Sequence, residues 1–82
     1  MSNLLIVDDE QSICWGLSKI VEGLGHTAIT KSSAEDALQV PTDVEPAVIV
    51  LDVRFPGVSG LDAMSQLRDR FGTVPIIIIT AH

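Results

Sequence analysis

The sequence predicts an α/β fold, in which helices cover both faces of a parallel sheet, and two observations lead to this prediction. Residues 4–7, 47–51 and 75–79 form three short apolar runs that are nearly continuous and rich in β-branched side chains. Strands that are buried on both faces of a sheet have this composition. Stretches with helical periodicity lie between the runs, and strands that alternate with helices are typical of a parallel α/β sheet.

The stretch after the first run is predicted to be a helix. Its apolar residues recur at helical spacing and form one stripe, made of Ile13, Leu17, Ile20, Val21 and Leu24. Gly25 follows the stripe, at a place where helices commonly end. Trp15 lies roughly opposite the stripe, so we expect its side chain to be partly exposed.

Two further helices are indicated by residues that favour helix ends. Ser33 and Ser59 each stand three residues before an aspartate, an arrangement that resembles a capping box. We expect Pro41 and Gly72 to end these two helices. A weaker apolar run at residues 27–31 alternates more than the others and suits a strand at the edge of the sheet. The 82 residues are thus predicted to form one domain with the order βαβαβαβ.

Charge and cysteine content argue against several classes of function. A net charge of −6 disfavours direct binding to nucleic acid or to an anionic membrane. The one cysteine, Cys14, cannot form an intramolecular disulfide, and we expect it to be a small packing residue in a reducing compartment. No apolar run reaches the roughly 18 residues of a membrane helix and no signal peptide is recognisable, so we expect a cytoplasmic protein.

Polar residues stand at the ends of the three apolar runs: Asp8 and Asp9 after the first, Asp52 after the second and Thr80 after the third. In a parallel sheet all carboxyl ends lie at one edge, and ligands of α/β proteins bind there. Each of these residues alone is more often a loop, cap or structural residue than part of a site. Their joint placement predicts a site at this edge.

Carboxylates that share one pocket repel one another unless a cation neutralises them. An all-oxygen set with few carboxylates favours Mg²⁺, since Ca²⁺ takes more protein oxygens, and one cysteine and two histidines argue against zinc. With a cation bound, Asp52 can act as a nucleophile on phosphorus and form an acyl phosphate. Thr80 can donate its hydroxyl to a phosphoryl oxygen.

Three segments resemble the receiver domains of two-component response regulators: residues 5–10 (LIVDDE), 48–60 (VIVLDVRFPGVSG) and 75–82 (PIIIITAH). The resemblance spans essentially the whole chain, and the last segment and Trp15 are similar to receivers of the nitrogen-regulator (NtrC) type. It implies a flavodoxin-like three-layer fold with a parallel sheet of strand order 2-1-3-4. It further implies a sensor histidine kinase as partner and control of transcription by the full-length protein.

The same resemblance assigns roles to single residues. Asp52 is implied to be the phosphoacceptor and, with Asp9 and the backbone carbonyl of Arg54, a direct ligand of Mg²⁺. Asp8 is implied to act on the ion through water. The phosphoryl group is implied to meet two further groups, the switch hydroxyl of Thr80 and the backbone of Ala81.

The chain also departs from the family pattern. Phe55 stands where receivers usually have methionine, a change between two bulky apolar residues. The sequence stops at His82, so we expect an incomplete receiver without the fourth helix, the fifth strand with its lysine, and the fifth helix. Residues 76–79 would then form an open apolar edge, so we expect that this 82-residue form either self-associates through the edge or is a fragment of a longer chain.

Two other classes of function are alternatives to the predicted phosphoacceptor. The chain could be an interaction module with an unused acidic site, which the missing lysine favours. A phosphatase of the haloacid-dehalogenase kind also uses an aspartate at a strand end, but it needs a second aspartate where this chain has Arg54. The leading prediction is therefore a signalling module that is no enzyme beyond slow self-phosphorylation and self-dephosphorylation.

Overall fold

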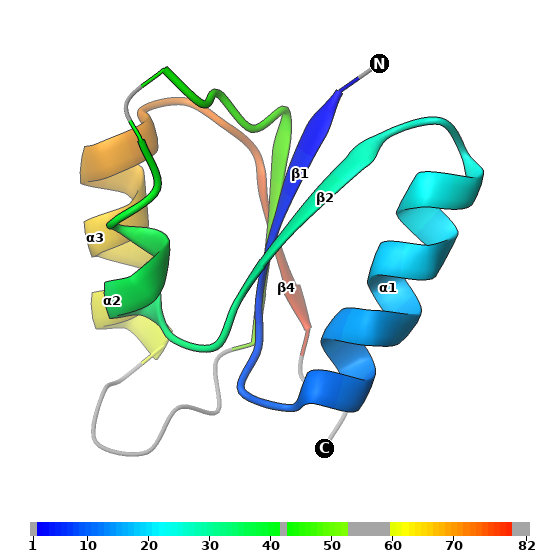
Figure 1. Ribbon diagram of the computed structural model, residues 1–82. Coiled ribbons are helices and arrows are strands. Elements are labelled where there is room, and N and C mark those ends of the chain that lie inside the picture. The colour runs from blue at the N-terminus through cyan, green and yellow to red at the C-terminus, as the bar shows by residue number, and fades with distance from the viewer. Residues whose placement is uncertain (1, 42, 53–59, 80–82) are drawn as a thin grey trace.

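The computed structural model of the protein describes residues 2–41, 43–52 and 60–79. Strands and helices alternate along the chain, as Figure 1 shows. The elements in chain order are β1 (Asn3–Val7), α1 (Gln11–Gly23), β2 (Thr27–Lys31), α2 (Ala34–Ala37), β3 (Val48–Asp52), α3 (Gly60–Phe71) and β4 (Ile76–Ile79). The predicted order of elements is therefore confirmed.

The four strands form one parallel sheet in the order β2-β1-β3-β4, as expected. β1 lies between β2 and β3, with Leu5 opposite both Ile29 and Ile49. β2 and β4 lie at the two edges. The weaker, alternating run was predicted as an edge strand, and this prediction is confirmed.

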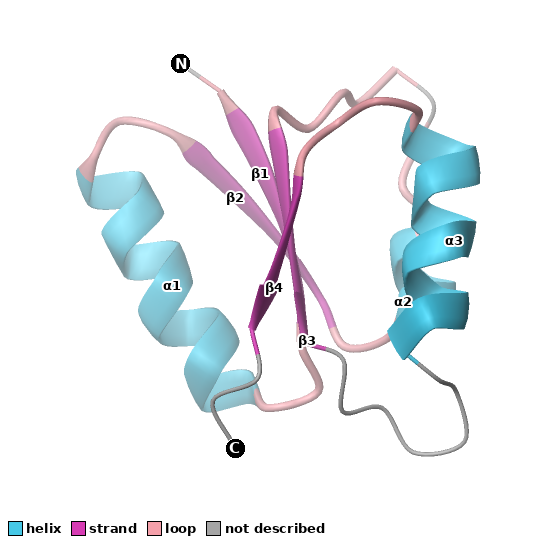
Figure 2. Ribbon diagram, turned by 180° about the vertical axis from the view of Figure 1, so that it is seen from behind, coloured by secondary structure: helices cyan, strands magenta, loops and turns pink. Residues whose placement is uncertain are grey.

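Helices lie on both faces of the sheet, with α1 on one side and α2 and α3 on the other (Figure 2). The larger core lies between the sheet and the pair α2 and α3. Its fully buried members include Leu5, Val7, Ile49, Leu51 and Leu67. On the opposite face, α1 packs against β2 and β1. The three-layer arrangement predicted from the sequence is thus present.

Only part of the apolar stripe predicted for α1 is buried. Val21 is buried together with Cys14, but Ile20 and Leu24 are 62% and 71% exposed. The reason is that α1 contacts β2 and β1, so only one side of the stripe reaches the sheet. Trp15, expected to be partly exposed, is 66% exposed.

The helix ends follow the local sequence. Gly25 and Gly72 adopt positive φ angles of 87° and 69° just after α1 and α3, where other residues would be strained. The Ser33 hydroxyl accepts a hydrogen bond from the Asp36 amide and caps α2. α2 ends at Ala37, before the proline expected to stop it. Ser59 lies outside the described residues.

β4 is more exposed than the two central strands. Ile77 and Ile78 are 53% and 43% exposed, whereas Ile49 and Leu51 of β3 are fully buried. The edge position explains the difference, because a side chain of β4 has a strand neighbour on one side only. In the part of the chain that the structure describes, no helix has the length and hydrophobicity needed to cross a bilayer.

Candidate functional site

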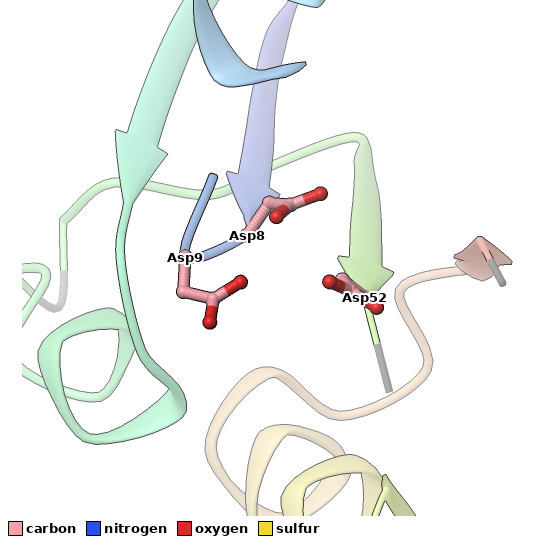
Figure 3. Close-up of side chains that lie close together, drawn as sticks. All are labelled: Asp8, Asp9 and Asp52. Carbon is pink, nitrogen blue, oxygen red and sulfur yellow. The ribbon is translucent and has the colours of Figure 1, made fainter. Parts of the chain in front are cut away.

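Three acidic side chains meet at the carboxyl edge of the two central strands (Figure 3). Asp8 and Asp9 directly follow β1, and Asp52 is the last residue of β3. The two strands are parallel, with Val7 opposite Leu51, so their ends lie side by side. One carboxylate oxygen from each of the three residues lies within 4.8 Å of the others. The convergence predicted for these residues is therefore confirmed.

The cluster brings three carboxylates together in a partly buried environment. Asp8 is 1% exposed and Asp52 is fully buried, whereas Asp9 is exposed. Two unit charges about 5 Å apart repel by roughly 3 kcal/mol at an effective dielectric constant near 20. Such a pair needs a compensating charge, and a hard divalent cation with oxygen ligands, such as Mg²⁺, fits this donor set. Asp8, Asp9 and Asp52 are the residues that could hold it.

The backbone around Asp8 ties this residue to two neighbouring elements. Its amide donates a hydrogen bond to the Lys31 carbonyl at the end of β2, at 3.0 Å. Its Oδ1 accepts a hydrogen bond from the Glu10 amide at 2.9 Å. Its carbonyl accepts a hydrogen bond from the Cys14 thiol in α1, at 3.3 Å. The position of Asp8 is thus set by β2 and by the first turn of α1.

Cys14 is buried, as predicted for a packing residue. Burial, and to a lesser extent the negative charge of Asp8, raises the pKa of the Cys14 thiol. The thiol is therefore protonated at neutral pH, which fits its role as a hydrogen-bond donor. A protonated, buried thiol is a poor nucleophile.

A groove of about 740 Å³ adjoins the acidic cluster between α1 and the end of β2. Its lining includes Asp8, Trp15, Lys19 and Lys31. The Lys19 ammonium lies 5.8 Å from the centre of the Trp15 ring. This groove was not predicted from the sequence, although the spacing of four residues between Trp15 and Lys19 places them on the same side of a helix.

Three further residues were predicted to belong to the site. Arg54, Thr80 and Ala81 lie outside the described residues, as do Phe55 and His82. Their implied roles in binding the cation and the phosphoryl group remain predictions.

A parallel α/β sheet with an acidic cluster at the carboxyl ends of its central strands defines a class of proteins that bind a ligand at this edge. Residues 4–82 match the family model described as "Response regulator receiver domain". The chain belongs to this family, which confirms the resemblance found in the sequence.

Relatives of the NtrC type are among the most similar proteins. The DNA-binding transcriptional regulator NtrC of Klebsiella pneumoniae is 39% identical over 77 residues, which are 94% of this chain and 16% of that protein. The solved beryllofluoride-activated NtrC receiver domain is 34% identical with a TM-score of 0.84, covering 99% of this chain and 65% of that one. This chain therefore spans about a sixth of the length of the first relative.

A further solved relative is the response regulator TrrA of Thermotoga maritima. Its structure in complex with Mg²⁺ and BeF matches this chain at 30% identity with a TM-score of 0.85, and the match covers 100% of this chain and 71% of that one. Its structure in complex with the histidine kinase ThkA matches this chain at 31% identity with a TM-score of 0.84. This match covers 99% of this chain and 70% of that one.

Proposed function

We propose that this chain is the phosphoacceptor module of a two-component response regulator and that Asp52 accepts the phosphoryl group from a sensor histidine kinase. The observation that carries the proposal is the convergence of Asp8, Asp9 and Asp52 at one sheet edge. The kinase as partner is supported by the complex of TrrA with a histidine kinase.

The chemistry assigned to Asp52 is nucleophilic attack. A carboxylate oxygen of Asp52 forms a bond to phosphorus while the bond from phosphorus to the donor nitrogen of the kinase breaks, which gives an acyl phosphate. Asp9 and Asp52, with the Arg54 carbonyl, would hold Mg²⁺ directly, and Asp8 would act through water. The bound ion would offset the charge of the phosphoryl oxygens. Thr80, through its hydroxyl, and Ala81, through its backbone, would also bind those oxygens.

The acyl phosphate would be lost by hydrolysis, which returns Asp52 to its carboxylate form. The module therefore turns over phosphate slowly on itself and acts as a signal carrier rather than as an enzyme. In a longer protein it would control transcription, as the name of the NtrC relatives suggests. The net charge of −6 disfavours direct binding of DNA by this segment itself.

The test is phosphorylation by a small phosphodonor in the presence of Mg²⁺, followed by intact-protein mass spectrometry. We expect a mass gain of one phosphoryl group that requires Mg²⁺ and disappears in Asp52→Asn. Asp69→Asn is a matched control, because it removes one negative charge from an exposed position of α3. A phosphorylated Asp52→Asn variant would refute the assignment.

A second candidate function is an interaction module that is never phosphorylated. Titration with Mg²⁺, followed by the fluorescence of Trp15, separates the two functions because Trp15 and Asp8 line the same groove. Saturation at millimolar Mg²⁺ supports the phosphoacceptor, and no binding in that range supports the interaction module.

We also propose that two copies of the chain associate through the edge strand β4. Ile77 and Ile78 are exposed on this strand, and a strand without charges is an open template for pairing. Sedimentation at several concentrations tests this association. We expect self-association that Ile77→Lys abolishes, and a monomer at all concentrations would contradict it.

A further inference from the structure

Asp8 belongs both to the acidic cluster and to the start of α1. The helix begins after Glu10, whose side chain makes no capping hydrogen bond. Instead, Asp8 Oδ1 accepts the hydrogen bond of the Glu10 amide, and the Asp8 carbonyl accepts that of the Cys14 thiol. The first turn of α1 is thus closed in part by a residue of the acidic cluster.

These two hydrogen bonds fix the side chain and the backbone of the same residue. The bond to Oδ1 restricts rotation of the Asp8 carboxylate. The bond from Cys14 fixes the Asp8 carbonyl and therefore the backbone that carries this side chain. Asp8 is 1% exposed, and one of its carboxylate oxygens lies within 4.8 Å of those of Asp9 and Asp52. If the first turn of α1 opened, both bonds would break and the carboxylate could swing away from the cluster.

We propose that Glu10, through its amide, and Cys14, through its thiol, are positioning residues that hold Asp8 for a divalent cation, so that cation binding and closure of the first turn of α1 form one coupled equilibrium. This inference rests on the proposed function, because it assigns the cluster to a cation. It adds that the helix start and the site open and close together.

The coupling makes a quantitative prediction for alkylation of Cys14. Cys14 is the one cysteine of the chain, so a thiol reagent reports on this position alone. If the thiol reacts only when the turn is open, and the open turn does not bind the cation, labelling slows by a factor of 1 + [Mg²⁺]/Kd. At ten times Kd the rate should fall about eleven-fold, compared with NaCl at the same ionic strength. Urea below the unfolding transition should leave the rate unchanged, since local opening exposes little surface.

Two proline variants test the role of the Glu10 amide. Glu10→Pro removes this donor, so we expect faster labelling of Cys14 without Mg²⁺ and weaker Mg²⁺ binding. Gln11→Pro is the matched control, because Gln11 is the first helical residue, where proline is well tolerated. Glu10 has φ and ψ angles of −89° and 111°, an extended conformation that a following proline accepts. Gln11→Pro should leave both measurements near those of the original chain.

A third comparison tests the Cys14 thiol. Cys14→Ala removes the donor, and we expect Mg²⁺ affinity to fall by roughly two- to five-fold, the effect of one weak hydrogen bond. Cys14→Ser keeps a donor and should restore most of the affinity. A residue with only a packing role would not give this rescue, because serine is no better than alanine at filling an apolar space.

The outcomes separate this inference from the function on which it rests. If calorimetry shows Mg²⁺ binding but saturating Mg²⁺ does not slow labelling, the coupling is refuted and the cation site stands. Equal Mg²⁺ affinities for Glu10→Pro and Gln11→Pro would also overturn the positioning role. If no Mg²⁺ binds at all, both the proposed function and this inference fail.

Discussion

Replacing the proposed phosphoacceptor should make the protein more stable when no cation is present. Asp8 and Asp52 are both buried, and their nearest ligand oxygens lie within 4.8 Å of each other. Asp52→Asn keeps the shape of the side chain and removes the charge. The repulsion of this pair is roughly 3 kcal/mol at an effective dielectric constant near 20, so we expect the free energy of unfolding to rise by about 1–3 kcal/mol.

The same variant should lose the response to Mg²⁺. A cation that binds only the folded chain stabilises it by about 1.4 kcal/mol at ten times Kd. Urea unfolding followed by far-ultraviolet circular dichroism, with and without Mg²⁺, measures both effects at a protein concentration that keeps the chain monomeric. Asp69→Asn controls for the change in net charge, since it lies exposed on α3.

Three separate results would each contradict a part of this reasoning. If Asp52→Asn is less stable than the original chain without a cation, the buried carboxylates do not repel as supposed. If Mg²⁺ also stabilises this variant as much as the original chain, the cation binds elsewhere. An increase in stability for Asp69→Asn of equal size would show a general effect of charge.

Three further predictions concern the fold and the thiol. Leu67→Ala, at a fully buried position of α3, should lower the free energy of unfolding by about 2–5 kcal/mol in urea melts, and a loss below 1 kcal/mol would contradict its place in the core. Gly25→Ala should cost about 1–2 kcal/mol in the same assay, because Gly25 has a φ of 87°, and no loss would show that the turn adapts. Burial and Asp8 raise the pKa of Cys14 above its ordinary value of 9.0, so the stability that the thiol contributes is present below this value and is lost as the pH rises through the higher folded pKa. Urea melts between neutral and alkaline pH should show this loss, and Cys14→Ala should reduce it.

The sheet could be predicted from the sequence because its central strands are buried on both faces. The apolar runs that became β1 and β3 have no alternation, and their cores, such as Ile6 and Ile49, are fully buried. The convergence of Asp8 and Asp52 then follows from parallel strands alone. These features follow from the hydrophobic pattern and from the alternation of strands with helices, and both can be recognised in the sequence.

The packing of α1 could not be predicted in the same way. Periodicity shows that Ile20 and Val21 lie on the same apolar side of the helix, but it does not show which strands the helix covers. The structure places α1 against β2 and β1, which buries Val21 and leaves Ile20 exposed. The hydrogen bonds from Glu10 and Cys14 to Asp8 were missed for a related reason: they depend on how the chain turns between β1 and α1.

The order of the strands in the sheet also sets the order in which the protein can be assembled during synthesis. β1 and β2 are synthesised before β3, and their pairing requires only the intervening α1. The acidic cluster exists only after β3 has docked on the other side of β1, which brings Asp52 to Asp8. A cation held by this cluster would therefore act only after the two inner strands are in register, and the mutual repulsion of Asp8 and Asp52 also arises only at that stage.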